Sequence, residues 1–548
     1  MTIIIPIALF ILLVACFFRL MEETTRAYIS KNFGSCLFVV VVALIMRLPI
    51  GGRHFMGLEY EDAFVYAAAS RQLLLTGPNA NEPMKTTLCV FGSMKDCQAE
   101  SSYGGHLMTL PIISATIQRL LGYSPYTICF LNGTASVVVA LLVYFLMLSL
   151  SGTGPSALCG ALVAALTPAM SIFHTSALAE TSSSLFVMIY VVACIGACRP
   201  QPRSVGVAIS SGTILVLSFL LAILTKRENL ALLIVAPIAM YVFRDIERKQ
   251  RHLLLVWCAF SITISILFIR VLNLPVVELD ESLGIGAPTF SFLNAFQILP
   301  VFIQAFSDVK FFSISSILFI FGLLALIYPR RLPRGYLVIY ALFTLYLAAY
   351  TFHYRSYYQV VHGSITPFES LRYISNFFPF FAVIAGLGGG LVVQWVISRF
   401  PSVTLNRYVF KGMVVLLVIG SALLTYSLKS NWLSDEYHVR IKPVIAVEDY
   451  LEKHPGIVLT DMPIAFQVFG RDTTIVVDSN SIGRVLPPQW VKDSLRGTQS
   501  VYWLHRKTSS TTVDRQRYPE FYKFISTTHL ADTGVTTDYY LLTRVTFD

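Results

Sequence analysis

Charged residues are scarce in this sequence, and that scarcity sets its physical class. Only 13% of the 548 residues are charged and 55% are hydrophobic, with a mean hydropathy of +0.66. The many long uncharged runs exceed what one soluble core could bury. Because a membrane span needs about 20 mostly apolar residues, the sequence predicts an α-helical polytopic membrane protein.

Motifs for built-in metal or redox chemistry are also missing. The sequence contains no CxxC or HExxH pattern, no fixed-period repeat and no low-complexity tract. Seven of the nine cysteines fall in or beside apolar runs, where a thiol acts as a small apolar side chain. Cys89 and Cys97 lie outside these runs. They form either a disulfide, in an oxidising compartment, or two free thiols.

The apolar runs predict about twelve or thirteen transmembrane helices. The expected spans lie near 3–18, 35–50, 126–149, 156–173, 182–198, 206–224, 228–243, 253–271, 310–328, 336–352, 374–396 and 411–427. A further run at 107–121 is interrupted by Arg119, and we expect it at the membrane interface. The first run lacks the basic segment of a cleaved signal, and its positive flank (Arg19, Arg26 and Lys31) follows it, so we expect a span with its N-terminus outside.

Short basic segments predict the orientation. RPQPR, RDIERKQRH, PRRLPR and RYVFKG all fall on one side when the spans alternate, and an excess of Lys and Arg marks the cytoplasm. Residues 51–125 and the C-terminal tail are therefore expected outside. The formal net charge of +10 does not indicate nucleic-acid binding, because much of the excess lies in these cytoplasmic connections.

Two domains are expected. Residues 1–427 form the transmembrane domain, with large external loops near 51–125 and 272–309, and residues 428–548 form an extracytoplasmic α/β domain. In the second domain VEDYLEKH has the pattern of a helix. GIVLTD, TTIVVD, SVYWLH and DYYLLTRV have the pattern of strands, punctuated by Gly, Pro and Asp. Nothing in this domain resembles a nucleophile or a phosphate-binding loop.

Three carboxylates crowd the first external loop. The stretch GLEYEDAFVY carries Glu59, Glu61 and Asp62 just after an expected span, and the residues that follow have helical periodicity. Acidic residues are favoured at a helix N-terminus, so one of them could simply cap this helix near the membrane interface. Three are more than a cap needs. The alternative is an acid/base site at the boundary between water and lipid.

At this point the sequence resembles a known family. EDAFVYAAASRQLL is similar to the Asp-Glu-x-x-Tyr-Ala-x-x-x-Arg-x-x-Leu segment of GT-C glycosyltransferases, integral-membrane enzymes that include protein O-mannosyltransferases and the lipid A aminoarabinose transferase. The spacing of Tyr66 and Arg71 places Asp62 at the family's catalytic aspartate. The usual Asp-Glu order is reversed here, so Glu61 stays an alternative base.

Further segments resemble the family in the same order along the chain. GGHLMTLPIISATIQRLLGYSPYTICFLNG, which contains His106, is similar to the family's amphipathic helix followed by a span. ALAETSSSLF carries a second acidic position at Glu180, LTKREN carries Lys226 and Arg227, and ESLRYISNFFPFF carries Arg372 and Tyr373. The resemblance covers most of residues 50–400.

The resemblance implies a role for each of these residues. Asp62 or Glu61 would take the acceptor's proton, and fixed cations would stabilise the departing phosphate. The implied phosphate-binding residues are Lys226, Arg227, Arg372, Lys85, Arg53 and Arg71, and the implied acceptor or sugar pocket contains Tyr66, His106 and Tyr373. Structural alternatives stay open, because cations often end a span, Arg372 could pair with Glu369, and His106 could be structural.

The donor implied by the resemblance is a sugar on polyprenyl phosphate, and the acceptor is a protein, a lipid or a glycan. No soluble nucleotide cofactor is implied, whereas Glu61, Asp62 and Glu180 could ligate a divalent metal ion. The expected location is the inner or plasma membrane, with the active site on the extracytoplasmic face. Two other classes stay open: a transporter or flippase of lipid-linked sugars, and a non-catalytic membrane scaffold.

Overall fold

The protein is described by a computed structural model that covers residues 32–47, 58, 61–76, 109–151, 153–198, 205–243, 248–271, 292–327, 332–352, 371–372, 374–399, 403–470, 475–479, 500–507 and 519–547. The chain divides into two compact units. The first comprises residues 1–50, 107–113 and 128–429, and the second comprises residues 51–106, 114–127 and 430–548. Most of the loop that we expected to be external, residues 51–125, therefore shares one unit with the C-terminal region.

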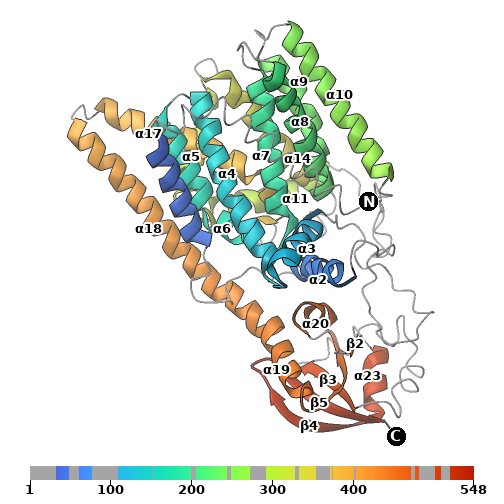
Figure 1. The fold of residues 1–548 in the computed structure, drawn as a ribbon. Coiled ribbons are helices and arrows are strands. Elements are labelled where there is room, and N and C mark those ends of the chain that lie inside the picture. The colour runs from blue at the N-terminus through green and yellow to red at the C-terminus, as the bar shows by residue number, and fades with distance from the viewer. Residues whose placement is uncertain are drawn as a thin grey trace. The chain divides into compact units, whose positions relative to one another are not determined.

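Helices build the first unit (Figure 1). They are the helix Asn32–Arg47, the start of α3 (Thr109–Leu121), α4 (Thr127–Ser151), α5 (Gly154–Leu166), α6 (Pro168–Phe173), α7 (Ala179–Ala197), α8 (Val205–Thr225), η2 (Arg227–Ile234), α9 (Val235–Val242), α10 (Arg248–Val271), α11 (Phe292–Ser307), α12 (Val309–Phe312), α13 (Ser315–Leu324), η4 (Ala325–Ile327), α14 (Arg334–Phe352), η6 (Ser375–Phe377), α17 (Phe378–Arg399) and most of α18 (Val403–Glu436).

Hydropathy located these helices well. Among the described residues, five helices are long and apolar enough to cross a membrane, and seven shorter apolar helices accompany them. Helices coincide with eleven of the twelve expected spans, and the span expected near 3–18 lies outside the described residues. One helix was not expected, because α11 occupies part of the segment 272–309 that we expected to be an external loop. Polar residues and Pro300 interrupt its apolar pattern.

Exposed apolar side chains suit these helices to lipid. On α10, for example, Val256 is 62% exposed and Leu267 is 55% exposed. Such side chains are costly in water but favourable in a bilayer. The protein is therefore a membrane protein, as the sequence predicted.

Close helix packing in the first unit depends on glycine. The sequence GLGGG in α17 faces α5 and α13, and a Cβ added to Gly386 would press on Gly160 of α5. A Cβ added to Gly388 would collide with the carbonyl oxygen of Leu318 in α13. The backbones approach this closely because no side chain intervenes, which is a common solution in membrane helices.

An arginine satisfies a broken helix end in the same unit. Pro168 separates α5 from α6, and because proline has no N–H, it cannot donate to the carbonyl of Ala164. Arg47 supplies donors instead, at 3.2 Å to Ala164 O and 2.6 Å to Ala165 O. Its Nε also donates to Ser136 Oγ on α4, at 2.8 Å.

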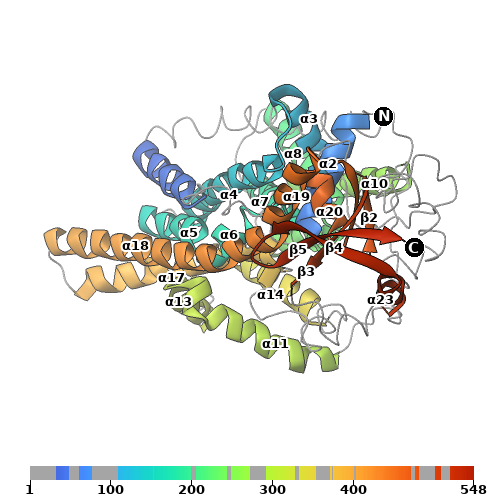
Figure 2. The ribbon, with the colours of Figure 1, turned by 90° about the horizontal axis from the view of Figure 1, so that it is seen from below.

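The second unit contains a five-stranded sheet of order β2-β1-β3-β5-β4. Its strands are β1 (Gly456–Thr460), β2 (Ile475–Asp478), β3 (Ser500–Arg506), β4 (Thr528–Thr536) and β5 (Tyr540–Phe547). Strands β2, β1 and β3 are parallel, whereas β5 pairs antiparallel with both β3 and β4. Figure 2 shows β3, β4 and β5 as neighbouring arrows.

The helices of the second unit are α2 (Glu61–Thr76), the end of α3, the π-helical turn η7 (Tyr437–Ile441), α19 (Lys442–Leu451), α20 (Pro463–Phe469) and α23 (Pro519–Ser526). The expected helix and all four expected strands of the C-terminal region are confirmed, and β4 is the strand that the sequence analysis missed. Its residues are mostly exposed, so it lacks the apolar run that revealed the others. The expected domain boundary near 428 stays a prediction.

Candidate functional site

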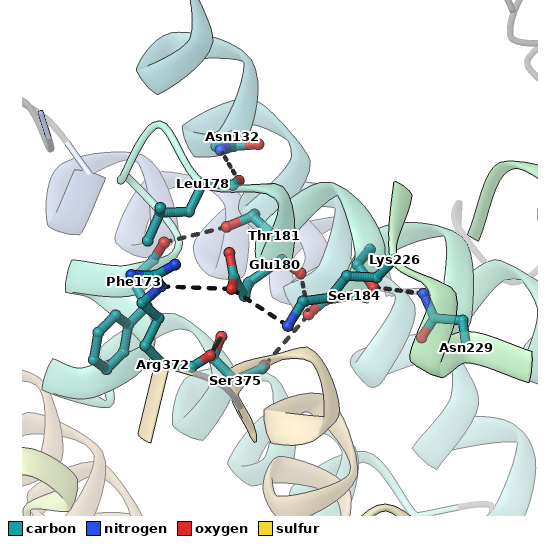
Figure 3. Close-up of polar contacts among 11 residues, drawn as sticks. Asn132, Phe173, Leu178, Glu180, Thr181, Ser184, Lys226, Asn229, Arg372 and Ser375 are labelled. Carbon is teal, nitrogen blue, oxygen red and sulfur yellow. Dashed lines mark hydrogen bonds and ion pairs between the residues drawn. The ribbon is translucent and has the colours of Figure 1, made fainter. Parts of the chain in front are cut away.

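Glu180 is the centre of a buried polar cluster in the first unit. It is the second residue of α7 and only 4% exposed, although a carboxylate is costly to bury without partners. Two cations reach the same carboxylate oxygen, Oε1. Lys226 Nζ lies 3.3 Å from it and Arg372 Nε lies 3.7 Å from it (Figure 3).

The two cations come from different parts of the chain. Lys226 occupies the extended position between α8 and η2, where its N–H still donates to Ala222 O at 2.9 Å. Arg372 lies just before η6. The side chains of Lys226 and Arg372 are 12% and 13% exposed. Lys226 Nζ also lies 5.8 Å from the ring centroid of Tyr350 on α14, close enough for a cation–π contact.

Asn132 on α4 holds the backbone that leads into Glu180. Its Nδ2 donates to Ser176 O at 2.6 Å and to Leu178 O at 2.7 Å. Its Oδ1 accepts a hydrogen bond from Ser182 Oγ at 2.9 Å. Because Leu178 and Ser182 flank Glu180 along the chain, this fully buried amide fixes the start of α7.

Asn229 likewise holds α7 and α8 in place on the other side of the cluster. Its Nδ2 donates to Ser183 Oγ and to Ala222 O, each at 2.8 Å, and its Oδ1 accepts from Tyr346 OH at 3.1 Å. These contacts join α7, α8 and α14 three residues after Lys226. The carboxylate and the ammonium group are therefore held by backbone that is itself hydrogen-bonded.

A serine connects α7 to the segment that carries Arg372. Ser184 Oγ lies 2.9 Å from Glu180 O and 3.4 Å from Ser375 O, and Ser375 Oγ donates to Arg372 O at 2.7 Å. Figure 3 shows Ser184 and Ser375 beside Glu180 and Arg372. The two cations and the carboxylate are therefore held together by backbone that is itself hydrogen-bonded.

The structure thus brings together three of the predicted site residues: Glu180, Lys226 and Arg372. The resemblance of their segments to family motifs, in the same order along the chain, had pointed to all three. Sequence reasoning did not single out Asn132 or Asn229. Both are amides within or beside an apolar span, and a buried polar residue in such a run is the signal that could have identified them.

Glu61 and Asp62 form the first turn of α2, as the capping and the catalytic hypotheses both expected. Their side chains, like that of Arg227 at the start of η2, are not among those described. Residues 63–70 are buried without exception, which includes Tyr66 at 7% exposure. The middle of α2 is therefore buried on all sides, whereas Arg71, Leu73 and Leu74 nearer its end are half-buried. Arg71 places its guanidinium carbon 5.0 Å from the ring centroid of Tyr123.

Other predicted residues lie outside the described part of the chain. They are Arg53, Lys85, Cys89, Cys97, His106 and Tyr373. Among the described residues, no group of three His, Cys, Asp or Glu side chains could hold a metal ion. The side chains of Glu61 and Asp62 are not among those described, so a divalent metal between them and Glu180 stays a prediction. Five of the described cysteines are buried and Cys258 is half-buried, as expected for cysteines in apolar spans.

Comparison with known proteins identifies the fold. No protein-family model and no curated protein matches the sequence. Among solved structures, ArnT from Cupriavidus metallidurans bound to undecaprenyl phosphate aligns with a TM-score of 0.61 and 13% identity, over 95% of this chain and 98% of that chain. This chain has the ArnT fold. The apo state of ArnT aligns with a TM-score of 0.59 and 11% identity, over 94% and 98% of the two chains.

ArnT is the lipid A aminoarabinose transferase, a GT-C glycosyltransferase. The sequence motifs had indicated this class, and the structural likeness confirms the predicted fold over nearly the whole chain. The likeness includes the second unit, because the alignment leaves out only a small part of either chain.

Proposed function

We propose that this protein is a glycosyltransferase that moves one sugar, a hexose or a pentose, from polyprenyl phosphate to an acceptor. The observation that carries the proposal is the ArnT fold together with the convergence of Lys226 and Arg372 on one buried carboxylate. ArnT has been crystallised with undecaprenyl phosphate. Two cations held in a nearly dry site are suited to a lipid-linked phosphate.

In the proposed reaction, an acceptor hydroxyl oxygen attacks the anomeric carbon of the donor sugar. The bond between that carbon and the phosphate oxygen breaks, and polyprenyl phosphate leaves with the electron pair. Asp62 takes the proton of the hydroxyl, and Glu61 is the alternative base. A single displacement of this kind inverts the anomeric configuration.

The cations act on the leaving group. Lys226 and Arg372 stabilise the negative charge that grows on the phosphate, and Glu180 keeps both at fixed positions when no donor is bound. Arg227, Arg71, Arg53 and Lys85 are further candidates for phosphate contacts. The acceptor or sugar pocket would contain Tyr66, His106 and Tyr373.

We propose that the reaction takes place on the extracytoplasmic face of the inner or plasma membrane. The basic connections between spans support this side, because they place the first large loop and the C-terminal region opposite the cytoplasm. A polyprenyl chain stays in lipid while its phosphate reaches the surface. The acceptor is a protein, a lipid or a glycan of the cell envelope.

The test is cleavage of the donor in detergent. Purified protein is incubated with a panel of polyprenyl-phosphate sugars and envelope extract, and the release of free polyprenyl phosphate is measured. A glycosyltransferase breaks the sugar–phosphate bond of one donor in micelles. A flippase only moves its substrate between leaflets, so intact donors throughout the panel would favour the transporter class. Repeating the assay with a chelator tests whether a divalent metal ion is needed.

A further inference from the structure

A short helix of the C-terminal region packs against the helix that begins with the candidate catalytic carboxylates. Helix α20 contacts α2, and both belong to the same compact unit. The two helices are far apart in the sequence, since α2 lies in the first external loop and α20 follows β1. The sequence pattern gave no reason to pair them.

Phe469, the last residue of α20, makes the aromatic part of this contact. Its ring centroid lies 6.2 Å from that of Phe64 on α2, in an edge-to-face arrangement. It also lies 5.9 Å from the ring centroid of Tyr126. Phe64 is 2% exposed and Tyr126 is 8% exposed, so these rings are excluded from solvent. Aromatic pairs of this geometry are stabilising beyond the area that they bury.

Tyr123 makes the polar part of the contact. Its hydroxyl donates a hydrogen bond of 2.6 Å to the carbonyl oxygen of Val468 on α20. The opposite partner of the same ring is Arg71 of α2, whose guanidinium carbon lies 5.0 Å from the ring centroid. Tyr123 therefore contacts both helices.

The end of α3 holds α2 from a second direction. Ser70 Oγ donates to Ser114 Oγ at 2.8 Å, and Arg119 donates to the carbonyl oxygen of Leu73 at 3.1 Å. With α20 on one side and α3 on another, every residue from 63 to 70 is buried. A helix enclosed in this way cannot shift without breaking several contacts at once.

Helix α20 is itself attached firmly to the sheet. Two residues separate it from β1, and there Met462 N–H donates to Thr460 Oγ1 at 3.1 Å and Pro463 begins the first helical turn. At its other end Gly470 N–H donates to Phe466 O at 2.7 Å. A Cβ added to Gly470 would lie 2.7 Å from Glu448 Oε1 on α19. The sheet and α19 therefore hold α20 in place, and α20 in turn contacts α2.

From these contacts we infer that Phe469 and Tyr123 are positioning residues, which hold α2 so that Glu61 and Asp62 at its start meet the acceptor and the donor. The inference rests on the proposed function. It gives the C-terminal region a part in catalysis through the placement of α2. A displacement of a catalytic group by about 1 Å can lower a rate by about a hundredfold.

Two readouts test the inference. The first is the kcat and KM of sugar transfer for Phe469→Ala, Phe469→Tyr and Tyr123→Phe. The second is the rate of amide hydrogen exchange in residues 61–76, which needs no activity. Leu530→Ala is the control for a lost apolar side chain, since Leu530 is 47% exposed on β4. Tyr539→Phe is the control for a lost hydroxyl, since Tyr539 is 46% exposed.

We expect Phe469→Ala to lower kcat at least about tenfold, with little change in the KM for the donor or the KM for the acceptor. It should also raise the rate of amide hydrogen exchange in α2. Phe469→Tyr keeps the ring and should restore kcat to within about twofold of the wild type. Tyr123→Phe removes one hydrogen bond and should lower kcat about fivefold. Both controls should match the wild type in kcat and in exchange.

Two results would overturn the inference. One is unchanged exchange in α2 for both Phe469→Ala and Tyr123→Phe. The other is a higher acceptor KM with unchanged kcat, which would make α20 part of an acceptor-binding surface instead. A wild type that cleaves no donor would contradict the proposed function and the catalytic half of the inference. The exchange rates would still decide whether α20 holds α2.

Discussion

The carboxylate of Glu180 and the ammonium group of Lys226 lie 3.3 Å apart inside the helical unit. Neither group is on a flexible segment, because α7 and the turn between α8 and η2 are each fixed by a buried asparagine. Arg372 reaches the same carboxylate oxygen. Removing one member of a buried ion pair is strongly destabilising when it leaves the other charge without a partner. Here a variant that loses one of the two cations still has the other cation paired with Glu180.

The first prediction concerns donor binding by Lys226. Lys226→Met should lower kcat/KM for the donor by about 10- to 100-fold, because a charge-assisted hydrogen bond to phosphate contributes about 1.5–3 kcal/mol. The protein should still fold, since Arg372 continues to pair with Glu180. The measurement is the initial rate of transfer against donor concentration. Lys310→Met is the matched control, because Lys310 is exposed on α12. Equal effects of both substitutions would contradict a role for Lys226 in binding the donor.

The second prediction concerns Asn132. Asn132→Ala removes the donors for the carbonyls of Ser176 and Leu178 and the acceptor for Ser182. Because these groups stay buried, the loss should be about 2–3 kcal/mol or more in the free energy of unfolding. Thermal unfolding in detergent measures the effect. Thr134→Ala is the control, since Thr134 is exposed on the same helix and donates only to Phe130 within it. A melting temperature that is unchanged in Asn132→Ala would contradict this account of the start of α7.

The third prediction compares two glycines. Gly388→Ala should destabilise the protein by at least about 1–3 kcal/mol, because the new methyl group meets the backbone of α13 and forces the helices apart. Gly420→Ala on α18 has no atom within 4 Å of the new Cβ, so it should be neutral or slightly stabilising. Both variants are compared with the wild type by thermal unfolding. Equal melting temperatures of Gly388→Ala and Gly420→Ala would contradict the close packing of α17 on α13.

The fourth prediction concerns acid stability of the C-terminal region. Asp538 accepts a hydrogen bond from Lys442 at 2.8 Å and lies 3.1 Å from His438 Nδ1. The Lys442 hydrogen bond, assisted by His438, lowers the pKa of Asp538 from its ordinary value of 3.8. Since the folded-state pKa is the lower one, the stabilisation is complete above the ordinary value and is lost as the pH falls through the folded value.

The wild type should therefore melt at a higher temperature than Asp538→Asn at neutral pH, and the difference should shrink as the pH falls below 3.8. The effect will be small because the group is exposed. Asp532→Asn, at an exposed position of strand β4, is the control. A difference between wild type and Asp538→Asn that grows on acidification would have the wrong sign for this ion pair.

Much of the fold could be predicted because membrane helices and buried strands are encoded by runs of apolar residues that are visible in the sequence. The motif order also located Glu180, Lys226 and Arg372 before their contacts were known. Periodicity shows which residues are buried, but it does not show what covers them. For that reason the packing of Phe469 on Phe64 and the hydrogen bonds of Asn132 and Asn229 could not be predicted. Helix α11 was missed because its apolar pattern is interrupted by polar residues and Pro300.

The most direct test of the central claim is the rate at which purified protein releases polyprenyl phosphate from its donor sugar, with wild type, Asp62→Asn and Glu61→Gln compared side by side. We predict release by the wild type and by Glu61→Gln, and loss of turnover in Asp62→Asn while that variant stays folded. Turnover lost only in Glu61→Gln would exchange the roles of the two carboxylates. Release that is equal in all three proteins would contradict the claim that α2 begins with the catalytic base.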